Sequence, residues 1–249
     1  MSSFFHFPSS EPRLEEVEIA FPKLPNNIII SAVLISDLHI RSSTNLPAIF
    51  SKVEKLSPSF LFLLGDNFTK MTIKRVREFI NLLTSLNPPL GKFAILGNGD
   101  EEELFLSIFN KAGVHLLNNE YCLVNESSLR ILLVGVDFEA KNISQLLASL
   151  PSSDLSILLS HRPDVILSKG DWRKIDLVLS GHTHGGQLRF PFFGPLFTKS
   201  KLPRRYSQGL FSFGHFHLYV SRGIGMTKIP IRFLCPPEIT LLKIKGGNP

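Results

Sequence analysis

Short apolar runs alternate along the chain with segments in which apolar positions recur every three or four residues. Runs such as Phe60–Leu64 and Leu155–Leu159 have the length and the continuous hydrophobicity of strands buried on both faces. The segments Asn45–Leu56, Ile73–Leu86 and Glu101–Ala112 have the periodicity of amphipathic helices. This alternation of strands and helices predicts an α/β fold.

Further elements continue the same pattern toward the end of the chain. Strands are predicted at Val17–Phe21, Ile28–Ser36, Phe93–Leu96, Tyr121–Val124, Arg130–Val136, Ile175–Leu179, Leu210–Phe213, His217–Val220 and Ile239–Ile244, and a short helix at Ile143–Leu150. The later strands are closely spaced, which indicates a second, mixed or antiparallel sheet packed on the first. No linker interrupts the series, so residues 1–249 are predicted to form a single domain.

The composition excludes several classes of protein. With 43% hydrophobic and 19% charged residues, the chain is too apolar to be disordered. Two cysteines, Cys122 and Cys235, are too few for a disulfide framework or a cysteine-rich zinc site, and they favour a reducing compartment. No apolar run approaches the roughly 20 residues of a membrane-spanning helix, and Met1–Pro12 lacks the pattern of a signal peptide. A cytoplasmic protein is therefore expected.

The chain is basic. Lys and Arg outnumber Asp and Glu by 27 to 21, which gives a net charge of +6 and a pI of about 9.4. A basic protein attracts acidic partners such as nucleic acid, anionic lipid or phosphorylated small molecules. Because the sequence has no arginine-rich helix and no aromatic RNA-binding motif, a nucleic-acid partner is not predicted.

Five of the predicted strands are each followed within three residues by Asp, Asn or His. These residues are Asp37, His39, Asp66, Asn98, His161, His182 and His184. In open α/β sheets, ligands bind outside the carboxyl ends of the strands, so we expect the seven side chains to converge. A single buried Asp or His is more often structural, but five strand ends in succession favour a site where cations balance clustered carboxylates and imidazoles.

The donor atoms fit two metal ions. Nitrogen and oxygen ligands without thiolate suit Mn²⁺, Fe or Zn²⁺. Asp66 has two carboxylate oxygens and can bridge two ions, whereas Asp37 and His39 can face one ion only if the chain bends after the strand. Two ions about 3.5–4 Å apart can hold a bridging hydroxide and clamp the oxygens of a displacement at phosphorus.

The motifs Asp37-x-His39, Gly65-Asp66-Asn67, Gly97-Asn98-x-Asp100, His161 and Gly181-His182-x-His184 resemble those of the calcineurin-like metallophosphoesterases. The resemblance implies two mixed β-sheets packed as a sandwich and flanked by helices. It also implies two divalent ions, with Mn²⁺ as the expected metal. The implied ligands are Asp37, His39, Asp66 and His184 for one ion, and Asp66, Asn98, His161 and His182 for the other.

The later motifs, Ser160–Asp164, Gly185–Gln187, Tyr219–Gly225 and Pro236–Ile239, are similar to those of the membrane-associated branch of that family. That branch includes a UDP-2,3-diacylglucosamine pyrophosphatase of lipid A biosynthesis. The resemblance therefore implies a nucleotide-linked glycolipid substrate, and a cytoplasmic enzyme that lies peripherally at the inner membrane. Arg162, Asn67, Arg222 and Arg41 are the candidate substrate contacts.

One position departs from the family pattern. Members commonly have His after the metal-binding Asn, where it helps to protonate the leaving oxygen, and here the residue is Gly99. Either activity is lost, or the substrate needs no acid at this place. An alkoxide leaving group benefits strongly from a proton donor, whereas a phosphate monoester benefits little. We therefore favour a phosphoanhydride, with UMP and 2,3-diacylglucosamine 1-phosphate as products.

Two questions stay open at this level. The segment Phe190–Phe197, followed by Lys199, Lys201, Arg204 and Arg205, suits contact with an anionic membrane surface, the lining of an acyl-chain cavity, or a loop that buries its Phe residues in the core. The alternative functions are a phosphodiesterase for another lipid or nucleotide, and a non-catalytic binding module stabilised by metal.

Overall fold

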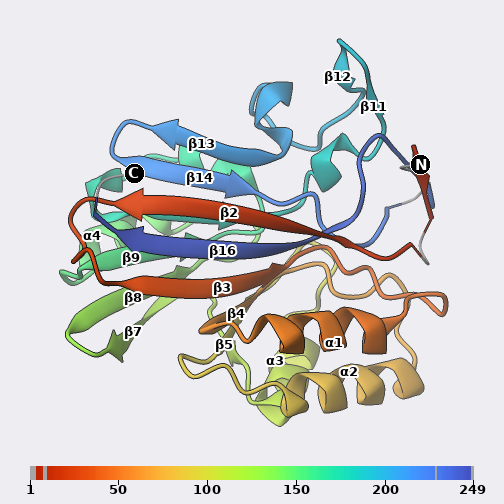
Figure 1. The fold of residues 1–249 in the computed structure, drawn as a ribbon, viewed down its shortest axis with the longest axis horizontal. Helices are drawn as coiled ribbons and strands as arrows, with labels where there is room; N and C mark the ends of the chain where they lie inside the picture. Colours follow the sequence, from red (N-terminus) through yellow and green to blue (C-terminus); the bar gives the residue numbers. More distant parts are fainter. Residues whose placement is uncertain (1–3, 8–9, 228, 248–249) are drawn as a thin grey trace.

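The computed structural model describes residues 4–7, 10–227 and 229–247, and two six-stranded sheets lie at its centre (Figure 1). The first contains, in spatial order, β2 (Arg13–Phe21), β16 (Glu238–Gly246), β3 (Ile29–Ile35), β4 (Phe60–Leu64), β5 (Lys92–Ile95) and β6 (His115–Leu116). The second contains β13 (Gly209–Phe213), β14 (Phe216–Val220), β10 (Leu177–Ser180), β9 (Leu155–Leu159), β8 (Leu129–Gly135) and β7 (Glu120–Glu126). The sandwich predicted from the sequence is confirmed.

Both sheets are mixed. In the first, β3, β4 and β5 are parallel, and β16 is parallel to β2 but antiparallel to β3. In the second, β8, β9, β10 and β14 are parallel, and the antiparallel strands β7 and β13 form the two edges. The strand β16 comes late in the chain but belongs to the first sheet, where it pairs with β2 and β3. The parallel strands that carry the candidate ligands thus lie inside each sheet.

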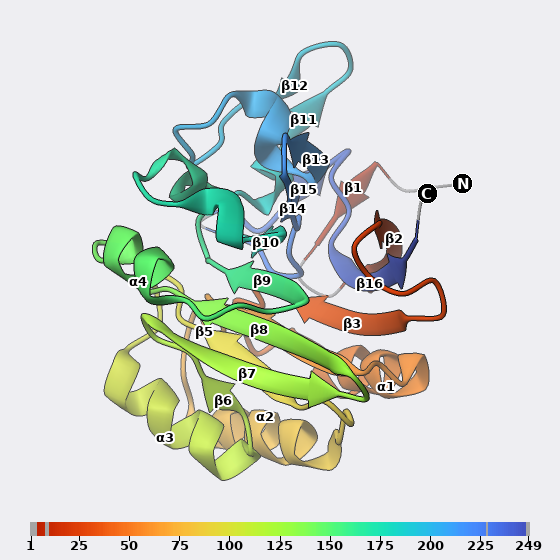
Figure 2. The same ribbon diagram turned by 90° about the vertical axis from the view of Figure 1, so that its left-hand side faces the viewer.

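Helices cover the outer faces of the sandwich (Figure 2). The helices α1 (Leu46–Leu56), α2 (Ile73–Ser85) and α3 (Glu102–Ala112) pack on the first sheet, and α4 (Ile143–Ser149) packs on the second. The predicted cap of α1 is present, since Oδ1 of Asn45 accepts a hydrogen bond from the Ala48 amide.

The core lies in three layers that follow from the alternation of side chains along each strand. In β4, Leu61 and Leu63 face the helices, whereas Phe60, Phe62 and Leu64 face the second sheet. Buried strands of this kind need apolar side chains on both faces, which explains the continuous hydrophobic runs in the sequence. This packing holds the carboxyl ends of the strands in fixed positions.

Two short antiparallel strand pairs stand outside the sandwich, at the upper right of Figure 1. The strand β1 (Phe5–His6) pairs with β15 (Arg232–Phe233), and β11 (Arg189–Phe190) pairs with β12 (Gly194–Pro195). The interpretation of Phe190–Phe197 as a loop that buries its Phe residues in the core is wrong, since Phe192 and Phe193 are 105% and 83% exposed. Within the described residues, no helix combines the length and the hydrophobicity needed to span a membrane.

Candidate metal centre

The loops that follow β3, β4, β9 and β10 are joined by backbone hydrogen bonds. The amides of Asp37 and His39 donate to the carbonyls of Gly65 and Asp66, each at 3.0 Å. In the second sheet, the amide of Gly181 donates to the carbonyl of His161 at 3.1 Å. These bonds place the predicted metal-binding residues of both sheets at one edge of the sandwich.

Four imidazoles at this edge form two pairs, with a carboxylate between them. In one pair, Nε2 of His39 lies 3.2 Å from Nε2 of His184. In the other, Nδ1 of His182 lies 3.2 Å from Nε2 of His161. Oδ2 of Asp66 lies 3.5 Å from His39 Nε2 and 3.6 Å from His161 Nε2, so one oxygen reaches both pairs. Ligand atoms bound about 2.1 Å from one ion are about 3.0–3.4 Å apart, close to these separations.

Asp37 reaches both pairs as well. Its Oδ1 atom lies 3.3 Å from Nε2 of His184 and 3.9 Å from Nε2 of His161. Two overlapping groups of ligand atoms result, one with Asp37, His39 and His184 and the other with Asp37, Asp66 and His161. The convergence expected from the strand ends is therefore present for six of the seven side chains.

Five of these residues have a left-handed backbone. The φ angles are 50° at Asp37, 41° at His39, 54° at Asp66, 66° at His182 and 52° at His184. This conformation costs a residue with a side chain about 1–2 kcal/mol, so it persists only where the surrounding structure imposes it. It supplies the bend that Asp37-x-His39 required, and it turns successive ligands toward one place.

Two glycines leave room for the carboxylates. A Cβ atom at Gly97 would collide with the side chain of Asp66. A Cβ atom at Gly181 would collide with the Ser36 hydroxyl and with the carboxylate of Asp37. The glycines of the two motifs thus allow the backbone to approach the carboxylates closely.

Hydrogen bonds from outside the cluster orient the donor atoms. Oδ2 of Asp37 accepts from the Ser36 hydroxyl at 2.5 Å and from the His182 amide at 2.9 Å, which turns Oδ1 into the cluster. Oδ1 of Asp66 accepts from the Gly99 amide at 2.8 Å. Nδ1 of His161 lies 2.6 Å from the carbonyl of Leu64, so Nδ1 donates there and Nε2 faces the two carboxylates.

The electrostatics of the cluster favour bound cations. Burial lowers the pKa of His39 and His184, and it lowers the pKa of His182 to about 3, so these imidazoles are neutral and their lone pairs are free at neutral pH. Burial also disfavours the charged form of His161, but its hydrogen bond to the carboxylate of Asp66 and the charges of both carboxylates outweigh it and raise its pKa to about 9. The carboxylates thus draw positive charge to this place.

The residues fit two divalent metal ions. Oδ1 of Asp37 is buried and has no hydrogen-bond partner in the described part of the chain, which is costly unless a cation occupies the adjoining space. Imidazole nitrogens and carboxylate oxygens surround it, and the thiol of Cys235 is turned instead to the carbonyl of His184. The donor set matches the nitrogen and oxygen ligands of Mn²⁺, Fe or Zn²⁺.

The other predicted residues differ in their surroundings. Asn98 is exposed in the turn after β5, between Gly97 and Gly99, which both contact Asp66. Asn67 is buried, and its side-chain amide donates to Asp100 at 3.2 Å.

The three candidate arginines lie on different sides of the cluster. The guanidinium of Arg162 pairs with Asp164 and lies 5.2 Å from the ring centroid of Phe138, which packs against the rings of His161 and His182. Arg41 donates to the carbonyls of residues 226 and 227. The guanidinium of Arg222 forms ion pairs with Glu15 and Glu238, which accounts for its burial without a substrate.

Asp100 and Arg232 support the site in ways that the sequence pattern did not indicate. The carboxylate of Asp100 accepts hydrogen bonds from the amides of Asp66, Asn67 and Gly97, so it clamps the loops after β4 and β5 together. Burial raises the pKa of Asp100 to about 6.

Arg232 is 0% exposed and donates to the carbonyls of His184, Arg222, Gly223 and Gly225. The amide of Gly225 in turn donates to the carbonyl of Asp37 at 2.6 Å. Arg232 therefore ties the loop of His184 to the loop of Asp37. Nothing in the spacing of the sequence marks it, because arginine is rarely buried and this one acts through backbone carbonyls.

Comparisons with known proteins agree with this geometry. Residues 30–186 match the family model of the calcineurin-like phosphoesterases. The metallophosphoesterase YkuE of Bacillus subtilis is 34% identical over 233 residues, which cover 87% of this chain and 79% of that protein. A Helicobacter pylori metallophosphoesterase is 33% identical, and the match covers 96% of this chain but 65% of the relative. The UDP-2,3-diacylglucosamine pyrophosphatase LpxG of Chlamydia muridarum is 32% identical over 278 residues, which cover 85% of this chain and 82% of that protein.

Solved structures share the fold. A 5′-nucleotidase from Staphylococcus aureus superposes with a TM-score of 0.50 at 11% identity, covering 86% of this chain and 54% of that one. The NAD nucleotidase of Haemophilus influenzae has the same TM-score at 16% identity, and the superposition covers 79% of this chain and 45% of that one. The sequence matches and the cluster of ligand atoms together lead to one assignment. The chain belongs to the calcineurin-like phosphoesterase family and is a metal-dependent phosphoester hydrolase.

Proposed function

We propose that the chain hydrolyses the pyrophosphate bond of UDP-2,3-diacylglucosamine, with two Mn²⁺ ions held by Asp37, His39, Asp66, Asn98, His161, His182 and His184. The products would be UMP and 2,3-diacylglucosamine 1-phosphate, formed on the cytoplasmic side of the inner membrane. The observation that carries the proposal is the cluster of two carboxylates and four imidazoles beside a position, Gly99, that offers no acid. The Chlamydia muridarum relative named for this reaction supports the choice of substrate.

The chain's own residues would prepare the site for an attack on phosphorus. When bound, two divalent cations supply a nucleophile from water and neutralise the phosphate oxygens. Asp66 places one oxygen between the two imidazole pairs and would help to hold both ions. Asp37 and His161 are fixed by bonds to Ser36 and Leu64, which keeps the ligand atoms directed inward before any substrate arrives.

The surroundings of Gly99 favour an anhydride. Its amide is used to hold Asp66, and the residue has no side chain to protonate a leaving oxygen. Asp100, the next residue along the chain, has a raised pKa, but its oxygens accept three backbone amides and the side-chain amide of Asn67. A leaving phosphate monoester, whose second pKa is about 6, departs without such help.

Two cavities, one beside each imidazole pair, favour one orientation of the substrate. One, of about 200 Å³, is lined by Phe138, Ser160 and Arg162 and adjoins the pair of His161 and His182. The other, of about 280 Å³, includes His184 in its lining. We place the nucleotide on the Arg162 side, where a guanidinium can pair with phosphate, and the acylated sugar on the more apolar His184 side.

The experiment is a single turnover assay with purified protein. The protein is freed of metal, supplied separately with Mn²⁺, Mg²⁺ or Zn²⁺, and incubated with UDP-2,3-diacylglucosamine in ¹⁸O-labelled water. We expect UMP carrying ¹⁸O, with the highest rate in Mn²⁺. Release of UDP would place the cleavage at the sugar, and turnover confined to diesters with alcohol leaving groups would favour a phosphodiesterase for another lipid or nucleotide.

A further inference from the structure

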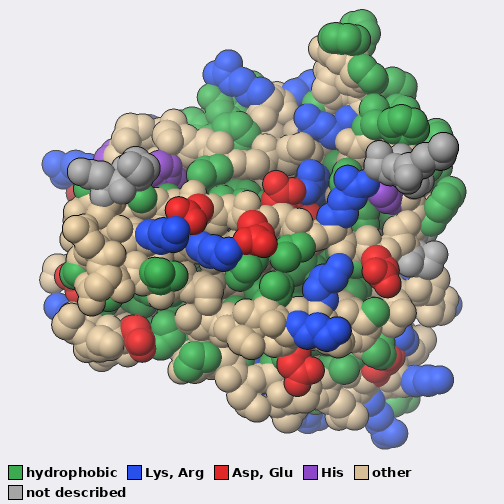
Figure 3. Space-filling model, in the orientation of Figure 1, with side chains coloured by type: hydrophobic (Ala, Val, Ile, Leu, Met, Phe, Trp, Pro, Cys, Tyr) green, Lys and Arg blue, Asp and Glu red, His purple; other side chains and the backbone are tan. Residues whose placement is uncertain are grey.

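A corner of the molecule beside the metal centre exposes an unusual number of apolar side chains. We name as the aromatic corner Phe4, Phe5, Phe7, Phe190, Phe192, Phe193, Leu196, Phe197 and Ile229, each between 38% and 105% exposed. Hydrophobic side chains gather on this side of the surface in Figure 3, over β1, β11 and β12. Contiguous exposed patches of this kind mark sites of protein or membrane interaction.

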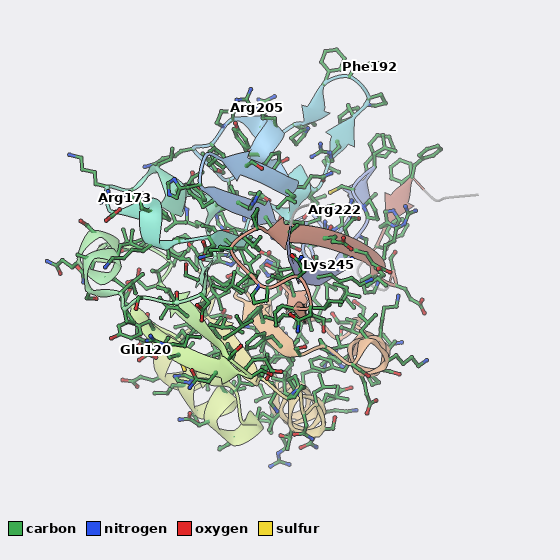
Figure 4. The ribbon with its side chains drawn as sticks, turned by 60° about the vertical axis from the view of Figure 1, so that its left-hand side comes forward. Glu120, Arg173, Phe192, Arg205, Arg222 and Lys245 are labelled. Atoms are coloured by element: carbon green, nitrogen blue, oxygen red, sulfur yellow. The ribbon has the colours of Figure 1, made fainter. Side chains whose placement is uncertain are left out.

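The aromatic corner is a built structure. The ring centroid of Phe233 lies 4.8 Å from that of Phe5 and 5.4 Å from that of Phe190. Phe233 therefore joins the strand β1 to the β11–β12 hairpin. The guanidinium of Arg189 anchors the hairpin by donating to the Gly185 carbonyl and the Ser207 hydroxyl. Phe192 stands at the hairpin tip and points away from the body of the protein (Figure 4).

The positive charge of the chain is concentrated in the span that forms most of the aromatic corner. Residues 177–237 contain eight of the 27 Lys and Arg residues of the chain and none of its 21 Asp and Glu residues. The rest of the chain has 19 basic and 21 acidic residues, so the positive charge is concentrated in this span. Lys199, Lys201, Arg204 and Arg205 are exposed here, and none forms an ion pair with a described acidic residue. Exposed aromatic rings bordered by cations match the interface of a bilayer with anionic lipid.

A cavity connects the aromatic corner with the metal centre. Phe197 and Ile229, which are 79% and 54% exposed, line the same cavity as His184, together with Leu188 and Lys199. A molecule held by its acyl chains in a bilayer at this corner would therefore meet the candidate metal ligands without entering water.

We propose that the aromatic corner docks on the surface of an anionic bilayer, and that the cavity between Phe197 and Ile229 admits the substrate from that bilayer to the metal centre. The docking rests on the exposed rings and on the charge of residues 177–237. The passage of substrate rests also on the proposed function, which the test must separate from docking.

Docking is tested by flotation with vesicles of phosphatidylcholine, with and without about a third of the lipid replaced by phosphatidylglycerol. We expect the wild-type protein to float with the anionic vesicles and to dissociate as salt screens the charges. The double variant Phe192→Ser and Phe193→Ser should bind at least about tenfold more weakly. Its matched control is Ile73→Ser with Ile29→Ser, which removes two side chains that are 75% and 67% exposed elsewhere.

The charge is tested separately. The variant Lys201→Gln, Arg204→Gln and Arg205→Gln should lose roughly a hundredfold in binding to anionic vesicles, from about fivefold for each charge. The control Lys55→Gln, Lys74→Gln and Arg77→Gln removes the same net charge from α1 and α2 and should bind as the wild type does. Thermal unfolding of every variant checks that it is folded.

Each outcome has a separate meaning. Wild-type protein that hydrolyses a soluble diester but fails to float would overturn the docking proposal and leave the proposed function intact. Protein that floats but shows no turnover of UDP-2,3-diacylglucosamine with Mn²⁺, Mg²⁺ or Zn²⁺ would reject the proposed function alone. Light scattering that shows a dimer, lost in the Phe192→Ser and Phe193→Ser variant, would identify a second copy of the chain as the occupant and overturn the bilayer.

Discussion

The metal centre and the aromatic corner reverse the usual distribution of side chains in opposite directions. At the metal centre, carboxylates and imidazoles are buried, and Asp37 and His161 are 0% exposed. At the aromatic corner, rings that would stabilise a core are exposed, and Phe192 has no cover at all. Both arrangements cost stability within the isolated protein. Each is explained by a component outside the chain: cations for the first and, in our proposal, a bilayer for the second.

The strand β15 connects the two regions. Its first residue, Arg232, extends to the loops of the metal centre, and its second, Phe233, packs with Phe5 and Phe190 in the aromatic corner. Successive side chains on a strand point to opposite faces, so two adjacent residues serve two different sites.

The largest effect is expected at the oxygen that joins the two imidazole pairs. Asp66→Asn keeps the shape of the side chain but removes the charge that balances two cations. Turnover of bis(p-nitrophenyl) phosphate should fall at least about a thousandfold, with a loss of bound metal measured by mass spectrometry. Asp154→Asn, an exposed carboxylate at the start of β9, is the matched control. If Asp66→Asn kept its activity within tenfold of the wild type, Asp66 would not be a metal ligand.

The second-largest effect is expected at Arg232, in the strand that connects the two regions. Arg232→Met fills a similar volume but leaves four backbone carbonyls without donors in a buried place. The free energy of unfolding in urea should fall by about 3–5 kcal/mol, and the metal affinity should fall with it. If this variant does not fold, Arg232→Lys keeps the charge and should give a smaller loss. Arg173→Met, at an exposed residue paired with Asp171, should leave the free energy of unfolding close to that of the wild type.

A change of about tenfold is expected at Gly99. The position has an ordinary φ angle, and a Cβ atom would lie 3.3 Å from Asp66 Oδ1, so a side chain fits with a small adjustment. Gly99→His should raise the hydrolysis of a diester with an alkyl leaving group about tenfold, because an imidazole can protonate the departing oxygen. Hydrolysis of a diphosphate should stay within about threefold. The steric control is Gly99→Ala, and an equal gain from alanine would show that proton donation is not the cause.

The two regions also differ in how far the sequence predicts them. The metal centre was predictable because Asp66 and His161 follow continuously apolar strands, and parallel strands bring their ends to one edge. A bend of the backbone was predicted only at Asp37-x-His39, where two alternate residues had to face one ion, and the left-handed conformation at the other ligands was not. Arg232 was not predictable, since its partners are carbonyls that carry no sequence signal. The two-residue strands around Phe190 and Phe233 are too short for any periodicity, and their rings could equally have been buried.

The smallest effect is expected where a whole ring is removed from the aromatic corner. Phe192→Ala should change the free energy of unfolding by less than about 0.5 kcal/mol, because the ring contacts solvent on every side. Phe62→Ala, the same truncation at a 0% exposed ring between the sheets, should cost about 3–5 kcal/mol. Urea unfolding of both variants gives the comparison directly. If Phe192→Ala destabilised the protein as much as Phe62→Ala, the ring would be packing against the chain, and its exposure would no longer require a bilayer.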